Sequence, residues 1–317
     1  MKILVLGAGA VGSVMGARLS ATGHSVELVG RPDHVAAIRA NGLRIEGTRP
    51  GTFRVGATPD LALTGDADAV ILGVKTTGLA TAAAALGRRF PHPVPTLLPQ
   101  NGLFVERSIL GPLRAARGTD PGPWVVRAVT LLGATLVAPG VVRQVGNGEL
   151  LFRDPALSGD TAPATRVFVE AFAKTGIVVR CVSDLDRELW RKAIVNAAIN
   201  PVTALERVPN GRLLEPPYRE EALRLLREAQ RAAAAAGYSF TDAEADADLD
   251  RVLRATADNR SSMLQDIERG RPTEIDAISG EIVRVAEAHG IDLPATRAVV
   301  ERLRGLPSAP DRRGQPS

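Results

Sequence analysis

Apolar residues up to residue 182 occur in short runs bounded by glycines and polar residues. Such runs are typical of strands buried in a sheet, and segments with helical spacing lie between several of them. Alternating strands and helices predict an α/β sheet whose first strands are parallel. The pattern predicts strands at 3–6, 25–29, 69–74, 94–98, 124–131, 148–152 and 177–182, and helices up to residue 19 and around 78–86, 103–110 and 163–175.

From residue 184 the pattern changes to long helical periodicities without a convincing strand. We therefore expect a first domain over 1–183 and an all-α second domain over 184–305. Residues 306–317 are rich in proline, glycine, serine and charge, and are predicted to be disordered. Two short apolar runs around Ala138-Pro139-Gly140 predict a small antiparallel addition between 129 and 145. The second-domain helices are predicted at 184–208, 217–236, 242–269, 274–289 and 295–305.

The first strand runs directly into a glycine-rich turn, Gly7-x-Gly9-x-x-Gly12, and a helix and a second strand follow. This is the order of a dinucleotide-binding βαβ unit. The first glycine permits the tight turn, the second lets the backbone approach a pyrophosphate, and the third lets helix and strand pack closely. The alternative is a structural turn without a ligand. The residues predicted to bind the nucleotide here are Gly7, Ala8, Gly9, Ala10, Val11 and Gly12.

The end of the second strand bears on which nucleotide is bound. NAD-binding units usually place Asp or Glu there to hold the ribose 2′-hydroxyl, whereas this strand ends in Gly30-Arg31. Glu27 lies inside the strand, too early to reach over its end. A guanidinium suits a 2′-phosphate and cannot replace a carboxylate acceptor, so NADP(H) is the predicted cofactor. The alternative is a solvated loop arginine.

Composition restricts the remaining possibilities. The 317 residues are 45% hydrophobic, 23% charged and 3% aromatic, which is typical of a globular chain large enough for two domains. Few aromatics and scattered basic residues argue against nucleic-acid binding, despite a net charge of +4. No apolar run has the length of a membrane span, and glycines interrupt the apolar start, so we expect a cytoplasmic protein without export or membrane binding.

Cysteine and histidine usage indicates neither a disulfide nor a metal site. Cys181 is the single cysteine, which excludes an internal disulfide, and its apolar surroundings predict a buried thiol. The four histidines share no metal-ligand spacing, so no metal is expected.

Lysine is scarce here, since only four of the 39 basic residues are lysines. Lys192 begins a series spaced by four, Lys192, Asn196 and Asn200, which places all three on one face of an otherwise apolar helix. Such a face is either a polar wall at a substrate cleft, with the ammonium as proton donor, or an interhelical hydrogen-bond network. Pro201 is expected to break or kink the helix and to leave this end open to a ligand.

Two further segments carry candidate chemistry. Gly270 is predicted to end one helix, and Thr273-x-x-Asp276 resembles an N-terminal capping box that would place Glu274 in the first turn of the next. That position alone indicates only dipole complementation. In the first domain, Lys75 and the segment from Pro99 to Gly102 follow two strands, at the sheet edge where doubly wound folds place ligands.

The ordered set of motifs resembles the ketopantoate reductase (2-dehydropantoate 2-reductase) family over residues 1 to about 305. The resemblance rests on the glycine turn and Arg31, on Val74-Lys75, Gln100-Asn101-Gly102 and Val145-Gly146-Asn147-Gly148, on Glu188 to Lys192 with Asn196, on Asn200 to Ala204, on Pro209-Asn210-Gly211, and on Ser261-Ser262-Met263 and Arg271 to Asp276.

This resemblance implies a Rossmann-like doubly wound first domain, a helical second domain and an active site between them. It also implies NADPH-dependent reduction of 2-dehydropantoate to pantoate, a step toward pantothenate and coenzyme A. By the same resemblance Lys192 is the proton donor, and Glu274 becomes a site residue beside it. Substrate would be bound by Asn196, Asn200, Asn210 and Ser262, and the nucleotide also by Arg31, Lys75, Asn101 and Ala134.

Two other functions stay open at this point. Related reductases share the scaffold but accept other 2-oxo acids or imines, and Thr76-Thr77 after Lys75 replaces a longer polar side chain of many members. The second possibility is an NADP(H)-binding regulator without turnover. The expected partner is a small 2-oxo acid, and the sequence does not decide between a monomer and a homodimer.

Overall fold

The computed structural model describes residues 1–306, which form two compact units. The first comprises Met1–Gln100 and Phe104–Leu185, and the second comprises Asn101–Leu103 and the chain from Asp186 onward. The sequence did not predict that Asn101–Leu103, which interrupt the first unit along the chain, would belong to the second unit. The segment predicted to be disordered lies, from residue 307 on, outside the described residues.

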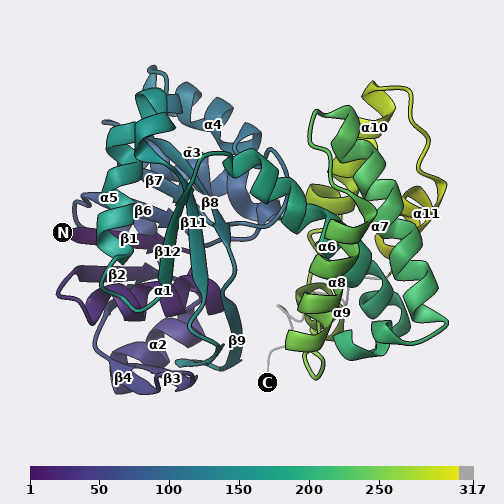
Figure 1. Cartoon of the computed structure of the whole chain (residues 1–317). Coiled ribbons are helices and arrows are strands. Elements are labelled where there is room, and N and C mark those ends of the chain that lie inside the picture. Colours follow the sequence, from purple (N-terminus) through teal and green to yellow (C-terminus); the bar gives the residue numbers. More distant parts are fainter. Residues whose placement is uncertain (307–317) are drawn as a thin grey trace. The chain divides into compact units, whose positions relative to one another are not determined.

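An eight-stranded sheet forms the centre of the first unit (Figure 1). All neighbouring strands are parallel except β8 and β11, so the predicted α/β class is confirmed as a mixed sheet. The chain passes from β1 to β2 on one side and later returns to β6 on the other, so the strand order reverses at β1. In spatial order the strands are β12 (Val178–Val182), β11 (Glu149–Arg153), β8 (Val125–Thr130), β7 (Thr96–Leu98), β6 (Ala69–Leu72), β1 (Lys2–Leu6), β2 (Ser25–Val29) and β5 (Gly56–Thr58).

Alternate residues of β1 enter two different apolar cores. Ile3 and Val5 pack in one core with α1 and α5, and Leu4 and Leu6 pack in the other with α3 and α4. Both faces of the strand are therefore buried, which explains why its sequence is a continuous apolar run. The helices of this unit are α1 (Ala10–Ser20), α2 (Pro32–Asn41), α3 (Leu79–Arg89), α4 (Arg107–Arg117) and α5 (Ala162–Phe172).

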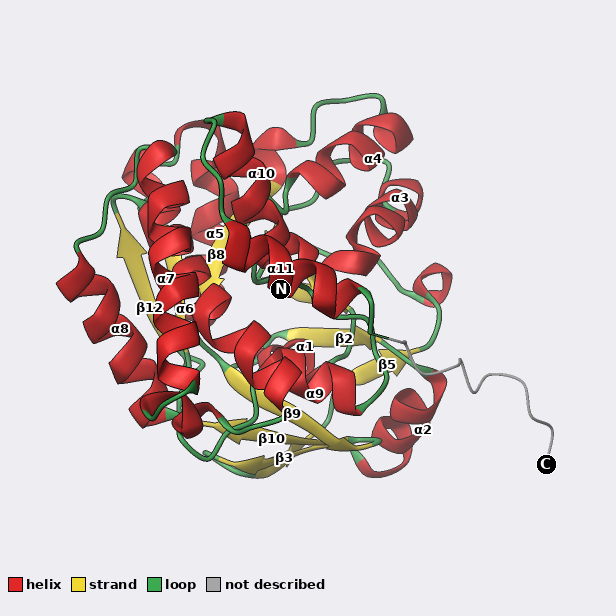
Figure 2. Ribbon diagram, turned by 90° about the vertical axis from the view of Figure 1, so that its right-hand side faces the viewer, coloured by secondary structure: helices red, strands yellow, loops and turns green. Residues whose placement is uncertain are grey.

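A second, four-stranded sheet packs against α1, and Figure 2 shows three of its strands side by side. The predicted antiparallel pair is confirmed as β9 and β10, but the pairing of β10 with β3 was not predicted. Arg18 of α1 connects helix and sheet, because its guanidinium donates to the Gln144 side chain and to the Thr48 carbonyl. The order is β4 (Gly51–Phe53), β3 (Leu43–Gly47), β10 (Val141–Val145) and β9 (Gly133–Ala138).

The prediction of a buried thiol at Cys181 is wrong, because the residue is exposed. Strand β12 lies at the edge of the sheet and pairs only with β11, so its apolar run is not covered on both sides. Val178, on the same strand, is also exposed.

His34 of α2 is buried between three parts of the first unit. Its Nδ1 accepts a hydrogen bond from the Gly140 backbone N–H at 2.8 Å, and its Nε2 lies 3.2 Å from the Ser13 hydroxyl of α1. Because Nδ1 accepts, the neutral ring carries its proton on Nε2. Burial lowers the pKa of His34, Asp33 opposes this shift and Arg31 adds to it. The native structure therefore favours the neutral ring.

This burial predicts a loss of stability in mild acid. Below about pH 6.5 the unfolded chain binds a proton at His34 more readily than the folded protein does, so the free energy of unfolding should fall by up to about 1.4 kcal/mol per pH unit until the folded protein is protonated too. Urea unfolding at a series of pH values measures this slope. His34→Gln should have a shallower slope and exposed His92→Gln should keep it. Equal slopes in all three proteins would contradict the assignment.

The second unit is helical, as predicted. Its helices are α6 (Leu185–Glu206), α7 (Tyr218–Ala235), α8 (Asp242–Ala255), α9 (Ser262–Glu268), α10 (Glu281–Ala288) and α11 (Pro294–Arg304), with a 3₁₀ segment at Asn210–Leu214 and a π-helical turn at Asp276–Gly280. Within residues 1–306, no helix combines the length and apolar character that crossing a bilayer requires.

Three helix predictions in this unit are wrong. The helix expected at 242–269 is two helices, because carbonyls of the intervening loop accept hydrogen bonds from Asn210 and Gly211 instead of continuing a helix. Thr273 caps no helix, since regular structure begins only with the π-helical turn at Asp276. Of the break or kink expected at Pro201, the break is wrong, because α6 continues to Glu206. Gly270 follows the end of α9 with φ +60°, as expected for the residue after a helix.

Candidate active site

The glycine turn between β1 and α1 is built by close backbone approach. A Cβ on Gly12 would stand 2.4 Å from the Gly7 carbonyl oxygen, and Gly7 itself has φ +111°. At Gly9, which is exposed, a Cβ would meet nothing nearer than 3.9 Å. The first and third glycines are therefore required by the protein, and the middle one leaves open space above the turn.

The first turn of α1 has the features of an anion-binding site. The N–H groups of Ala10, Val11 and Gly12 have no acceptor in a preceding helical turn, because the first intrahelical bond runs from Ser13 to Gly9. This turn has neither an acidic side chain nor a side-chain cap at Gly9. Together with the space above Gly9, these donors fit a dinucleotide pyrophosphate.

The other nucleotide candidates of the first unit lie beside this turn or on a strand packed against its helix. A Cβ on Gly30 would meet the Ala8 Cβ at 2.7 Å, so Arg31, exposed at the start of α2, directly follows a contact with the turn. A Cβ on Gly73 would lie 2.4 Å from the Gly7 oxygen, and Lys75 follows two residues later. Ala134 lies on β9, which packs against α1.

Helix α6 carries the lysine and amide series. Lys192 and Asn196 are half-buried and Asn200 is buried, while Trp190 and Ile194 pack in the interior. The spacing of four places the three polar side chains on one face. Glu188, one turn before Lys192, is on that face as well. The helix therefore presents a carboxylate, one ammonium and two amides on a single face.

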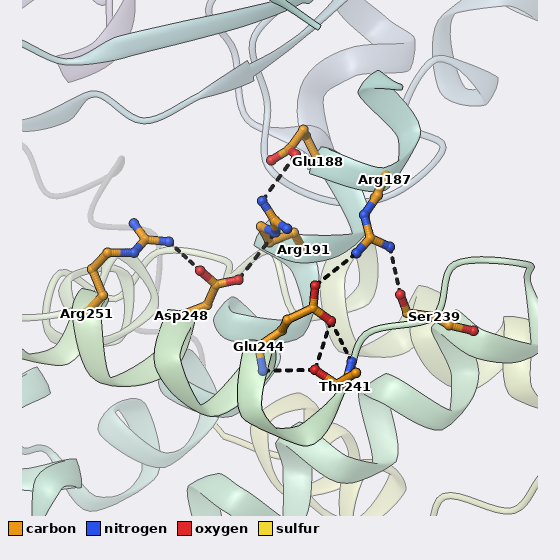
Figure 3. A network of polar contacts seen from close by, with 8 residues as sticks. All are labelled: Arg187, Glu188, Arg191, Ser239, Thr241, Glu244, Asp248 and Arg251. Carbon is orange, nitrogen blue, oxygen red and sulfur yellow. Dashed lines mark hydrogen bonds and ion pairs between the residues drawn. The ribbon is translucent and has the colours of Figure 1, made fainter. Parts of the chain in front are cut away.

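An ion-pair network fixes the first turns of α6 against α8 (Figure 3). Arg187 donates to the Ser239 carbonyl at 2.7 Å and pairs with Glu244, and Arg191 pairs with Glu188 and Asp248 at 3.3 Å each. Both guanidinium groups also lie over the Phe240 ring. Arg191 immediately precedes Lys192, so the network restrains the backbone from which the lysine projects.

The loop between α8 and α9 gathers three of the predicted substrate residues. The Asn210 backbone N–H bonds to Asn259 in this loop, and the hydroxyls of Ser261 and Thr203 lie 2.7 Å apart, one turn after Asn200 on α6. Ser262 is the exposed first residue of α9, while its neighbour Ser261 is buried as the helix cap. Asn200, Asn210 and Ser262 thus surround one loop.

The hydrogen bond between Thr256 and Asn210 was not predicted from the sequence. The Thr256 hydroxyl donates to the Val252 carbonyl at 2.7 Å and accepts from Asn210 Nδ2 at 2.9 Å, which fixes the orientation of the amide. The Asn210 Oδ1 is consequently a buried acceptor without a hydrogen-bond partner in the described structure. No spacing rule points to Thr256, because the contact joins residues 46 positions apart.

Glu274 lies just before the π-helical turn and is half-buried. Its neighbour Ile275 packs with Ala204 of α6 and Met263 of α9, so Glu274 belongs to the same part of the second unit as Ser262. The Leu103 N–H donates to the Ala277 carbonyl at 3.1 Å, which places the segment Asn101–Leu103 beside this turn.

Fold and site define a class, an α/β oxidoreductase with a dinucleotide-binding sheet and a helical second unit. Residues 3–156 match the family model described as Ketopantoate reductase PanE/ApbA, and residues 184–306 match Ketopantoate reductase PanE/ApbA C terminal. The chain therefore belongs to the ketopantoate reductase family, whose members bind NAD(P)H. The resemblance stated from the motifs is confirmed.

Relatives match along nearly the whole chain. The 2-dehydropantoate 2-reductase of Archaeoglobus fulgidus is 33% identical over 97% of this chain and 98% of its own, and that of Halobacterium salinarum is 34% identical over 96% and 98%. A solved ketopantoate reductase structure from Ralstonia eutropha has a TM-score of 0.81 at 31% identity, covering 96% and 97%. D-mandelate dehydrogenase with NADH and anilino(oxo)acetate has a TM-score of 0.85 at 23% identity, covering 96% and 97%, which shows a shared fold.

Proposed function

We propose that this protein uses NADPH to reduce 2-dehydropantoate to pantoate, a step toward pantothenate and coenzyme A. The observation that carries the proposal is the α6 face, where Lys192 stands one turn from Asn196 and two turns from Asn200 on a helix whose middle is otherwise largely buried. The names of relatives about one third identical over nearly the full chain support this substrate.

NADPH, when bound, supplies a hydride to the substrate carbonyl carbon. The Lys192 ammonium protonates the carbonyl oxygen, so the ketone becomes an alcohol with one hydride and one proton. Unlike a guanidinium, an ammonium gives up its proton readily when it is desolvated. Asn196, Asn200, Asn210 and Ser262 offer amides and a hydroxyl to the oxygens of the substrate, and Glu274 binds a substrate hydroxyl or orients Lys192.

The nucleotide is assigned to the first unit. The residues proposed to bind it there are Gly7 to Gly12, Arg31, Lys75 and Ala134, with Asn101 joining them from the segment that clusters with the second unit. The open turn without acidic residues suits the pyrophosphate, and Arg31 suits a 2′-phosphate.

A substrate panel tests the proposal. NADPH oxidation should be fastest with 2-dehydropantoate, with kcat/KM at least about tenfold above that for 3,3-dimethyl-2-oxobutanoate, which lacks only the terminal hydroxyl. The similarity in fold to D-mandelate dehydrogenase makes 2-oxo-2-phenylacetate the informative competitor. A higher kcat/KM for that acid would identify a different 2-oxo acid reductase. Nucleotide binding without turnover of any 2-oxo acid would indicate a regulator.

A further inference from the structure

Gln100 follows β7 by two residues, and its side chain is directed at the backbone of the neighbouring strand. Its Nε2 donates to the carbonyls of Leu72 and Val74, at the exit of β6, with 2.9 Å to the latter. Because both partners are carbonyl oxygens, the amide has only one chemically sensible orientation. The residue is 8% exposed, and its Oε1 is buried without a hydrogen-bond partner among the described residues.

The two carbonyls held by Gln100 flank the segment on which the nucleotide turn rests. A Cβ on Gly73 would stand 2.4 Å from the Gly7 oxygen, and a Cβ on Gly7 would stand 2.4 Å from the Val74 nitrogen. The backbones are therefore in direct contact with no side chain between them. The turn is also anchored on its other side, where the Gly7 and Ala8 N–H groups donate to the Val29 carbonyl, so a displacement of the β6 exit is carried mainly by Val74 and Lys75.

The position of this segment in the sheet indicates which half of a nucleotide it affects. In doubly wound sheets the dinucleotide crosses the strand ends where the strand order reverses, and here that point lies between β1 and β6. Arg31, at the end of β2, is on the adenosine side. The exits of β6 and β7 are consequently on the nicotinamide side.

We propose that Gln100 is a positioning residue for the nicotinamide half of the nucleotide: it fixes the β6 exit and, through it, Lys75. The unpartnered Oε1 is unfavourable, whereas the two hydrogen bonds from Nε2 hold the carbonyls of the β6 exit in place, and a methionine of similar size would remove both. The proposal rests only on the nucleotide part of the proposed function.

Gln100→Met tests the proposal by calorimetric titration with two ligands. The Kd for NADPH should rise about tenfold, while the Kd for 2′-phospho-ADP-ribose, which lacks the nicotinamide nucleoside, should change less than about twofold. Gln230→Met is the control, since Gln230 in the second unit is also buried and donates from Nε2 to a backbone carbonyl, that of Phe240. Equal losses for both ligands, no loss for either, or the same selectivity in Gln230→Met would overturn the proposal.

A second variant remains informative if the first is unstable. In Gln100→Glu an ionised carboxylate faces two carbonyl oxygens, whereas the protonated acid donates one hydrogen bond, so NADPH affinity should recover as the pH falls. A pH profile parallel to that of the wild-type protein would contradict the proposed role. Turnover does not enter these measurements, so a wrong substrate assignment leaves their result unchanged.

Discussion

Replacing Lys192 by alanine should lower kcat about a thousandfold and leave the Kd for NADPH nearly unchanged. A positioned general acid contributes about 10²- to 10⁴-fold to the rate, and the α6 face offers one ammonium to protonate the substrate oxygen. The nucleotide, in contrast, is assigned to the first unit, whose turn does not contain this lysine. Steady-state kinetics with 2-dehydropantoate and fluorescence titration with NADPH measure the two quantities.

Two further variants separate proton donation from charge. Lys192→Arg keeps the positive charge but cannot release a proton near neutral pH, so it should be about as slow as the alanine variant. Lys174→Ala removes an exposed lysine of the first unit and should keep full activity. Activity within a few-fold of the wild-type protein in Lys192→Ala would show that another group donates the proton.

Replacing Arg31 by alanine should raise the Kd for NADPH about 100-fold and leave that for NADH nearly unchanged. Hydrogen bonds to charged groups contribute about 1.5–3 kcal/mol each, and a 2′-phosphate loses its guanidinium partner in this variant. Every 1.4 kcal/mol corresponds to about tenfold in affinity, so the upper part of this range gives the expected change. NADH, with a 2′-hydroxyl, makes no such contact.

The two nucleotides serve as each other's control in this experiment. Arg166→Ala, which removes an exposed arginine on α5, measures any effect of net charge alone. Equal weakening of NADPH and NADH in Arg31→Ala would mean that the arginine supports the turn instead of reading the 2′ position. Unchanged affinity for both nucleotides would mean that Arg31 is in contact with solvent and not with the nucleotide.

Two parts of the candidate site could be predicted from the sequence because they depend on residues close together in the chain. The β1–α1 turn follows from three glycines between an apolar strand and a helix, and the α6 face follows from a spacing of four. Pro201 misled because a missing N–H does not have to end a helix. The missing N–H affects only the Ala197 carbonyl one turn earlier, and α6 continues for six residues after Asn200, to Glu206.

The features that could not be predicted from the sequence depend on contacts between residues far apart in the chain. The second sheet pairs β3 with β10, about 100 positions apart, and each strand alone is too short to predict. The break between α8 and α9 depends on hydrogen bonds from Asn210 and Gly211. The hydrogen bonds of Gln100 to Val74 and of Asn210 to Thr256 join residues that only the fold brings near, so no spacing rule reveals these contacts.

The assignment of Asn101–Leu103 to the helical unit changes how this chain can be divided. The polypeptide passes between the units at three points, after residues 100, 103 and 185, instead of through one linker. A gene cut at residue 185 would separate the helices from the tripeptide whose Leu103 N–H is bonded to Ala277. Fragments for separate expression, or chimaeras that exchange the helical half with a relative, therefore need to carry or replace that tripeptide as well.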